Sequence, residues 1–446
     1  MIPTLRPYQM EAITKIRNAC LTGSRAVLAV LPTGAGKTNL GCELARSAVA
    51  KGRKVLWIAH RTELIEQAYD RLREFGLNPG AIAAGTVRPP QPFAPVQVAS
   101  IQTLLARHTR PQANLVIYDE CHHAPSDLWS QLVEDYRASA HLIGFTATPE
   151  RSDGRGLGNL FTRIVVGARV RELVDLSFLV PCEIRRPASK MRPGAIAQRP
   201  VDAYLTEANG RRAVVFSPNV AAAKAHLEEF TAAGIRAALV HAGTPPGDRS
   251  TTLRGLHSGA VQVLLNVYVC TEGWDCPPIS CVILARGCGT AGIFLQMVGR
   301  GLRPAPGKPD CLLLDLHGIS HIHGHPEDDR VYSLEGKGIR RGDDATVEGD
   351  QPSCRVCGAP VQPGEACPEC GTEPRVMVPP TVTGAPLVRY AAKRAEGPEK
   401  QAETLARWMR TGAEKGYKDG WASQKFKSVY GAWPTPTVQS QARRAV

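Results

Sequence analysis

The chain has 446 residues, of which 43% are hydrophobic and 21% charged, and its formal net charge is +13 at pH 7. No apolar run is long enough to span a bilayer, and residues 1–9 lack the pattern of a signal peptide, so we expect a cytoplasmic protein without membrane contact. A chain of this length suits two or three domains. The excess of basic over acidic residues suits a polyanionic partner, although many basic proteins bind no polyanion.

Residues 1–168 alternate short apolar runs with helical patterns. The runs expected to form buried strands are 26–31, 55–59, 96–100, 115–118 and 142–145. Strands that alternate with helices indicate a parallel sheet covered on both faces. We therefore expect a first α/β domain over residues 1–168.

The rest of the chain divides by composition. Residues 169–210 contain four well-separated prolines and are expected to form a connector. A second α/β domain is expected over 211–318, followed by an extension loop (319–350), a four-cysteine module (351–375) and a basic, mostly helical tail (376–446). The expected fold class is thus α/β, with two tandem parallel-sheet domains.

A glycine-rich turn follows the first strand of the first domain. Its residues are Pro32, Thr33, Gly34, Ala35, Gly36, Lys37 and Thr38. Such a turn lets backbone N–H groups converge on a phosphate at a helix N-terminus, where Lys37 would reach the β- and γ-phosphates of ATP and Thr38 would bind Mg²⁺. The longer P-loop pattern asks for glycine where this chain has Leu31, so a chance glycine turn is the alternative.

A pair of carboxylates follows the strand at 115–118. Asp119 is placed to hold the Mg²⁺ shell, and Glu120 to polarise the attacking water as a general base. Acidic residues after a strand are also common in solvated turns. The P-loop earlier in the same domain favours the catalytic interpretation.

Two further motifs extend the pattern. Leu5-Arg6-Pro7-Tyr8-Gln9 opens the chain, and Phe145-Thr146-Ala147-Thr148-Pro149 follows a later strand. With the P-loop and Asp119-Glu120-Cys121-His122, this set resembles the superfamily 2 helicases of DEAD/DEAH-box type, in an Asp-Glu-Cys-His variant. The resemblance implies two RecA-like domains that share one ATP.

The resemblance also assigns roles. Gln9 would read the adenine edge with Arg6 and Tyr8 nearby, and Thr146 and Thr148 would couple the nucleotide state to domain movement. Strand-contacting motifs would supply His60, Arg61, Gln102 and Thr103, although ordinary loops after strands are the alternative. In the second domain, the resemblance points to Ser217, Asn219 and Thr271 for coupling or nucleic-acid contact, to Gly273 for the phosphates and to Asp275 for the ribose.

An arginine pair lies in the second domain, in Gln296-Met297-Val298-Gly299-Arg300-Gly301-Leu302-Arg303. Arg300 and Arg303 are three residues apart and are expected to share one helix face. By resemblance they are arginine fingers that stabilise charge on the γ-phosphate, with Gln296 in the same motif; a solvated basic helix is the alternative. The common form of this motif has His-Arg where this chain has Gln296 and Met297. Forms that depart in this way occur in DNA-directed members of the superfamily, so DNA is favoured over RNA.

Four cysteines form two Cys-x-x-Cys knuckles, Cys354 with Cys357 and Cys367 with Cys370. Each knuckle can place two thiolates on one tetrahedral Zn²⁺; iron in a rubredoxin-like site or two disulfides are the alternatives. A separate His cluster at 317, 321, 323 and 325 lacks a rigid ligand spacing. A polar loop is favoured there over a metal site.

The tail interleaves aromatic and basic residues over 416–427, which fits either core packing or a docking surface. Two motor domains, a cysteine knuckle and this tail resemble the bacterial RadD proteins and related phage helicases. That resemblance implies a monomeric motor in repair or recombination on forked or branched DNA, with single-stranded-DNA-binding or recombination proteins as partners. An RNA helicase, a nucleotide-switched clamp that does not unwind, and the motor subunit of a restriction system are the alternatives.

Overall fold

The structure is a computed structural model that describes residues 2–86, 88–123, 128–149, 156–192, 194–269, 274–335, 380–391, 398–414, 416–417, 420–430 and 434–444. The chain divides into two compact units, one of Met1–Pro326 with Tyr332–Ala391, the other of Glu327–Val331 with Ala392–Val446. Over the described ranges, no helix combines the length and the apolar character that crossing a membrane requires.

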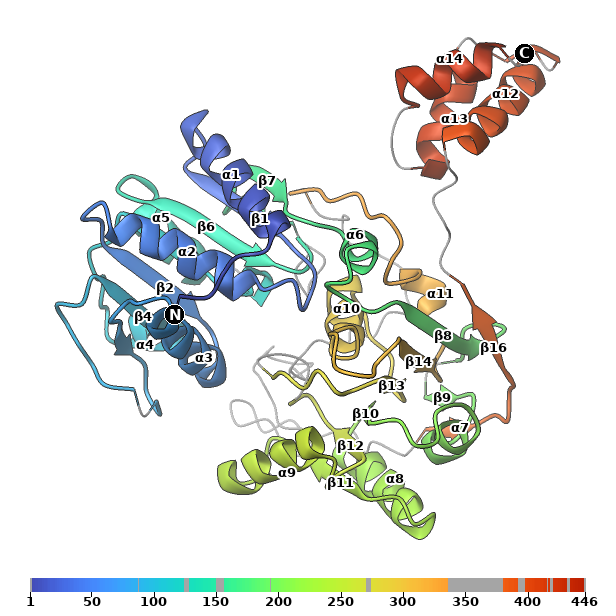
Figure 1. Ribbon diagram of the computed structural model, residues 1–446, viewed down its shortest axis with the longest axis horizontal. Coiled ribbons are helices and arrows are strands. Elements are labelled where there is room, and N and C mark those ends of the chain that lie inside the picture. Colours follow the sequence, from blue (N-terminus) through green and yellow to red (C-terminus); the bar gives the residue numbers. More distant parts are fainter. Residues whose placement is uncertain are drawn as a thin grey trace. The chain divides into compact units, whose positions relative to one another are not determined.

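The first α/β domain is built on a seven-stranded sheet with the order β3-β4-β2-β5-β6-β1-β7, in which all neighbours are parallel (Figure 1). Its strands are β1 (Ala26–Val30), β2 (Val55–Ala59), β3 (Gly80–Ile82), β4 (Val96–Ser100), β5 (Leu115–Tyr118), β6 (His141–Thr146) and β7 (Arg163–Val166). Its helices are α1 (Pro7–Leu21), α2 (Lys37–Val49), α3 (Thr62–Glu74), α4 (Ile101–Ala106) and α5 (Leu128–Arg137), with a short 3₁₀ turn at Cys121–His123.

Strand β1 shows why these runs are continuously apolar. Successive side chains of a strand point to opposite faces of the sheet. Val27 and Ala29 join the core that includes α1, α2 and α3, whereas Leu28 and Val30 join a second core that includes α4. Helices therefore cover both faces, as the sequence predicts. The carboxyl ends of β5, β6 and β1, which are neighbours, bring three motif loops to one edge of the sheet.

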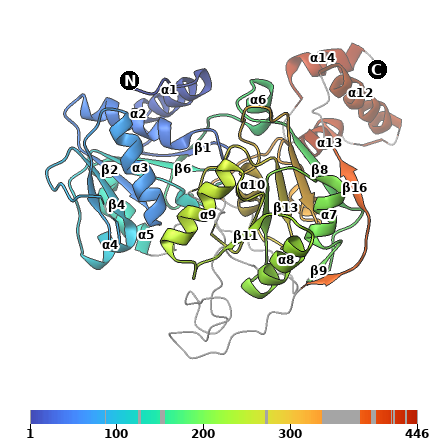
Figure 2. The same cartoon turned by 60° about the horizontal axis from the view of Figure 1, so that its bottom comes forward.

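The second α/β domain contains a sheet with the order β11-β12-β10-β13-β14-β8-β16, parallel except for β16, which is antiparallel to β8. Its strands are β8 (Cys182–Pro187), β10 (Ala213–Phe216), β11 (Ala237–Val240), β12 (Val263–Asn266), β13 (Cys281–Leu284), β14 (Cys311–Asp315) and β16 (Leu387–Tyr390). The helices are α6 (Val170–Asp175), α7 (Pro200–Glu207), α8 (Val220–Ala232), α9 (Pro246–Ser258), α10 (Ala291–Gly299) and α11 (Ser320–His323). Figure 2 shows α8 and α9 beside β11.

Two boundaries of this domain differ from those expected. Residues 169–210, expected as a connector, contribute α6, β8 and α7, and β9 (Ala195–Ile196), which pairs with β15 (Thr381–Val382). The prolines do not prevent this because they stand at element ends: Pro187 is the last residue of β8, and Pro200 is the first of α7. Strand β16, from the segment expected as a helical tail, completes the edge of the sheet.

Where the structure describes it, the other unit contains three helices, α12 (Pro398–Glu414), α13 (Trp421–Tyr430) and α14 (Pro436–Arg444). Helix α12 packs against both of the others. Their core is small and aliphatic apart from one ring, and it consists of Ala402, Leu405, Ala406, Ala422, Phe426, Val438 and Ala442. The helices therefore bury a core of their own.

Candidate ATP-hydrolysis site

The P-loop connects β1 to α2, and its two glycines adopt the left-handed backbone that the turn requires. Gly34 has φ 87° and Gly36 has φ 74°. At Gly36 a side chain would also collide with Gln9, because a β-carbon there would lie 2.5 Å from its Nε2. Helix α2 begins at Lys37, so its unpaired N–H groups face the loop as a phosphate site requires.

Lys37 and Glu120, which the sequence assigns to the same site, form an ion pair. The Nζ of Lys37 lies 3.0 Å from Oε1 of Glu120, and both side chains are largely buried. Glu120 has φ 48°, a left-handed conformation that is rare outside glycine, and its N–H donates to Oδ1 of Asp119 at 3.1 Å. Backbone strain of this kind concentrates at functional sites, since the surrounding fold must maintain it.

Residues of the N-terminal motif hold the P-loop. Tyr8 donates from its hydroxyl to the carbonyl of Ala35 at 2.8 Å, and Gln9 donates from Nε2 to the same oxygen at 3.0 Å. The Oε1 of Gln9 accepts from the N–H of Arg6, and the Arg6 guanidinium lies 4.6 Å from the ring centroid of Phe178. Burial raises the pKa of Tyr8. Gln9 thus supports the loop, while its predicted adenine contact stays a prediction.

His122 connects three motifs, a role that the sequence analysis missed. Its Nδ1 lies 3.1 Å from Oγ1 of Thr146, and its Nε2 lies 3.0 Å from Nε2 of Gln296 on α10. Thr146 donates its hydroxyl proton to the carbonyl of Thr148, so Oγ1 must accept from His122. This assigns the proton of His122 to Nδ1 and leaves Nε2 to accept from Gln296. The sequence feature that could have indicated this role is the histidine two residues after Glu120.

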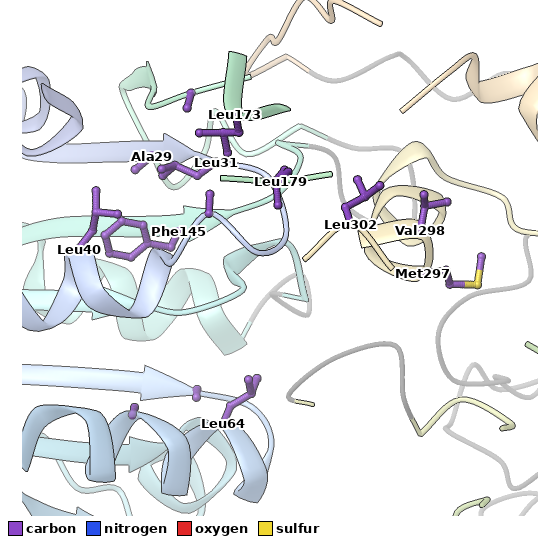
Figure 3. Close-up of a cluster of buried hydrophobic side chains, with 14 of the residues drawn as sticks. Ala29, Leu31, Leu40, Leu64, Phe145, Leu173, Leu179, Met297, Val298 and Leu302 are labelled. Atoms are coloured by element: carbon purple, nitrogen blue, oxygen red, sulfur yellow. The ribbon is translucent and has the colours of Figure 1, made fainter. Parts of the chain in front are cut away.

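Helix α10 of the second domain packs directly on the P-loop domain. A β-carbon at Gly299 would lie 2.6 Å from Cβ of Thr33, and one at Gly292 would lie 2.5 Å from Oγ1 of Thr148. Glycine at both positions permits this close approach. Figure 3 shows side chains of the shared apolar core. Leu31 and Leu179 lie near the P-loop, Val298 lies on α10, and Leu302 lies in the turn that follows α10.

The arginines of this motif differ in position from the prediction. Helix α10 ends at Gly299, so Arg300 is its C-cap and Arg303 lies beyond it, and the two do not share a helix face. Arg300 is buried and donates to the carbonyl of Trp274, while Arg303 pairs with Asp275. The side chain of Arg303 also lies against the P-loop, because a β-carbon at Gly34 would be 3.3 Å from its Cγ. Asp275, expected at the ribose, is here a partner of Arg303.

The residues present fit ATP with Mg²⁺. Two buried hydroxyl oxygens near the P-loop, Oγ1 of Thr33 and Oγ1 of Thr148, have no hydrogen-bond partner in the described part of the protein. Buried polar groups normally have partners, so a polar ligand belongs beside them. Lys37 and the start of α2 would hold the phosphates, and Thr38 and Asp119 the Mg²⁺, which would draw charge from the phosphate oxygens when bound.

The predicted nucleic-acid contacts are placed as follows. His60 and Gln102 are brought together by a 3.2 Å bond from Nε2 of Gln102 to the carbonyl of His60. Thr103 is buried, and its hydroxyl accepts from the N–H of Ala84; Arg61 is the N-cap of α3. In the second domain, Ser217 and Asn219 are buried, and Asn219 caps α8 by accepting from the N–H of Ala222 at 2.8 Å. Contacts with nucleic acid stay predictions for all of them.

Six predicted site residues lie outside the described ranges: Thr271, Gly273, Cys354, Cys357, Cys367 and Cys370. Within the described ranges, no group of three or more His, Cys, Asp or Glu could hold a metal ion. His321 and His323 lie on α11, where each ring bonds a carbonyl, of Pro187 and Cys288 respectively.

Comparison with known proteins gives two family matches and several relatives. Residues 2–151 match the family "Type III restriction enzyme, res subunit", and residues 197–305 match "Helicase conserved C-terminal domain". A 51.5 kDa protein of a Lactococcus phage is 28% identical over 74% of this chain and 74% of its own length. The DNA 3'-5' translocase XPB2 of Sulfurisphaera tokodaii is 32% identical over 34% of this chain and 32% of its own.

Among solved structures, the ATP-dependent Type ISP restriction-modification enzyme LlaBIII bound to DNA superposes with a TM-score of 0.55 at 15% identity. The match covers 70% of this chain and 28% of that one, and it supports the fold alone. The two family matches fall on the two parallel-sheet domains, and the P-loop, the Asp119–Glu120 pair and α10 lie within them. Both sheet domains therefore match helicase families, which supports a helicase of superfamily 2, and the chain is an ATP hydrolase.

Proposed function

We propose that the protein is a DNA-dependent motor that moves along DNA by cycles of ATP hydrolysis and acts on forked or branched DNA. The observation that carries the proposal is the hydrogen-bond path from Thr146 through His122 to Gln296. It joins the carboxylate loop of the first domain to a helix of the second. A change at the nucleotide can then bias the contact between the two domains.

Each residue has a defined part in this proposal. Glu120 accepts a proton from the attacking water, and Lys37, which pairs with Glu120 in this structure, turns to the phosphates. Arg300 and Arg303 approach the γ-phosphate from the second domain once they leave Trp274 and Asp275. Release of the product would then let α10 separate from Thr33 and Thr148.

DNA is favoured over RNA by two observations, and the net charge is consistent with either nucleic acid. Restriction enzymes, which act on DNA, give their name to the family matched by residues 2–151, and a relative is named as a DNA translocase. Gln296 stands where RNA-directed members of the superfamily commonly have histidine. The net charge of +13 suits contacts to phosphates, which both nucleic acids offer.

The test is ATP turnover measured side by side with single-stranded DNA, duplex, fork, four-way junction and RNA. We expect the largest stimulation with forked or branched DNA, and none in the Lys37→Ala variant. Stimulation by RNA alone would replace the proposal with an RNA helicase. ATP binding with little turnover on every substrate would favour a nucleotide-switched clamp.

We also propose that Cys354, Cys357, Cys367 and Cys370 hold one structural Zn²⁺. Their two Cys-x-x-Cys pairs support this, since such pairs supply four thiolates in tetrahedral geometry. Elemental analysis of freshly purified protein should find one zinc per chain, and loss of zinc in a Cys354→Ser, Cys357→Ser variant. Iron in place of zinc, or no metal at all, would contradict the proposal.

A further inference from the structure

One lysine side chain joins the two loops that carry Arg303 and its partner Asp275. The Nζ of Lys308 donates to the carbonyl of Arg303 at 2.6 Å and to the carbonyl of Pro277, two residues after Asp275, at 2.9 Å. Arg303 also pairs with Asp275, so the loops are connected twice, once between side chains and once through the ammonium group. The ammonium group therefore restrains the backbone from which Arg303 extends.

Closure of the local turn does not require this lysine side chain. The N–H of Lys308 donates to the carbonyl of Ala305 at 3.1 Å, and Gly307 supplies a left-handed residue with φ 72°, so the backbone closes the turn by itself. The acidic residue that follows, Asp310, pairs with Arg211. A lysine normally keeps its ammonium group in water, whereas the half-buried Lys308 directs it onto two carbonyls.

The position of the backbone at Arg303 matters because its side chain lies against the P-loop. A β-carbon at Gly34 would be 3.3 Å from Cγ of Arg303 and 3.6 Å from its Nε. The N–H of Val180 donates to the carbonyl of Leu302 at 2.8 Å, so Val180 and Lys308 hold consecutive carbonyls. Only the side chain of Arg303 then has to move to reach a phosphate. Displacing a reacting group by about 1 Å can cost on the order of 10²-fold in rate.

The ammonium group also titrates close to neutral pH. Burial lowers the pKa of Lys308 to about 8; Arg303 lowers it as well, whereas Cys311, Cys276 and Asp310 raise it. Burial raises the pKa of Cys276 to about 11 and that of Cys311 to about 12, so neither thiol changes charge near pH 8. A charged donor forms a stronger hydrogen bond than a neutral one. Lys308 therefore binds the two carbonyls more weakly once its proton is lost.

We infer that Lys308 is a positioning residue for Arg303, holding the backbone there so that the guanidinium reaches the γ-phosphate during hydrolysis. The inference rests on the proposed function, which gives Arg303 that role, and adds a residue that the sequence analysis did not assign to the site. Lys308 acts through Arg303 and does not itself touch ATP. Its removal should consequently lower kcat and leave ATP affinity almost unchanged.

The test is steady-state ATP turnover of the full chain, without DNA and with forked DNA, between about pH 6.5 and 9.5. At pH 7, Lys308→Met should lower kcat about 10–100-fold and change the KM for ATP less than about threefold. Lys308→Arg keeps a charged donor throughout this range and should retain most of the turnover. Turnover should fall above pH 8 in the wild type but not in Lys308→Arg. Lys224→Met, which removes an exposed lysine of α8, is the matched control and should behave like the wild type.

A double-mutant cycle with Arg303 separates positioning from folding. Adding Lys308→Met to Arg303→Ala should cost less than about threefold more, because the second change has little left to remove. Arg303→Ala alone should also lack the alkaline fall in turnover, a comparison that holds even where circular dichroism shows that Lys308→Met folds poorly. Near-normal kcat in a folded Lys308→Met would overturn the inference. So would an identical alkaline fall in the wild type, Lys308→Arg and Arg303→Ala.

The outcomes distinguish this inference from the proposed function. If DNA stimulates none of the proteins, the proposed DNA motor fails, while turnover without DNA still decides the role of Lys308. If DNA stimulates the wild type but Lys308→Met costs as much in the Arg303→Ala background as alone, the proposed function stands and the inference is wrong. Normal turnover in Arg303→Ala would remove the proposed role of Arg303 and this inference with it.

Discussion

Glu120 combines a left-handed backbone with a buried ion pair to Lys37. The backbone conformation directs the carboxylate toward the P-loop instead of along the strand. The charged atoms of the pair lie 3.0 Å apart and are largely buried, so each charge is balanced by the other until a phosphate binds to Lys37. The carboxylate is then available for the attacking water.

Replacing this carboxylate tests its role as the general base. Glu120→Gln should lower DNA-stimulated ATP turnover by about 10²–10⁴-fold, since only the proton acceptor is lost, while ATP affinity is retained. Steady-state turnover and nucleotide binding would be measured together. Glu134→Gln is the matched control, because Glu134 is exposed on α5 and forms an ion pair with Arg137. Near-normal turnover in Glu120→Gln would refute the assignment.

His122 and Gln296 should act as one unit. His122→Ala and Gln296→Ala should each reduce the stimulation of turnover by DNA, because either change breaks the bond between the domains. The double variant should be no worse than the more severe single variant, since the second change then has nothing left to remove. Additive losses in this double-mutant cycle would show that the two residues act separately.

The residues of the P-loop and the carboxylate loop could be predicted from sequence because each motif is local and follows a strand. The bond between His122 and Gln296 could not, since it joins residues 174 positions apart. The pairing of Arg303 with Asp275 was missed for another reason: both had been assigned to the nucleotide, and no pattern shows that they bind each other.

At the scale of elements, helix α8 contains a buried histidine that should make the second domain sensitive to acid. His226 lies 3.4 Å from the Ser217 hydroxyl, measured from Nδ1, and burial lowers its pKa from 6.5 to about 4. The neutral form is therefore the one that fits the fold. Between these two values the unfolded chain binds the proton more readily than the folded one.

Stability should consequently be complete above pH 6.5 and decline as the pH falls toward 4. From pH 7 to pH 5 the expected loss is about 2 kcal/mol in the free energy of unfolding of the second domain. Thermal unfolding across this range would show a fall in melting temperature that is smaller in a His226→Gln variant. An identical pH dependence in both proteins would show that other groups cause the acid sensitivity.

Elements also differed in how far the sequence revealed them. In the first sheet, β1, β2, β4, β5 and β6 were predicted because buried runs of β-branched and aliphatic residues are distinctive, whereas β3 and β7 were not. Strand β8 was not, since its sequence from Cys182 to Pro187 contains three charged residues and is bounded by prolines. Its place between β14 and β16 comes from tertiary pairing, which local composition does not encode.

At the scale of the whole molecule, the net charge of +13 has a measurable consequence. Phosphate contacts release counterions, so DNA affinity should fall linearly with salt on logarithmic axes, with a steep negative slope. Titrating a labelled DNA at several salt concentrations measures that slope. A flat response would mean that the positive charge serves another purpose.

The antiparallel strand β16 has a further consequence during synthesis of the chain. Leu387 pairs with Pro187, so the partner of β8 is made 200 residues after it. At a ribosomal rate of about 5–20 residues per second, β16 is synthesised roughly 10–40 s after β8, and until then the edge of β8 that pairs with β16 is unpaired. Through that interval one row of backbone donors and acceptors is open to other chains. The nascent protein is therefore most exposed to aggregation between the completion of its second set of parallel strands and the arrival of its last strand.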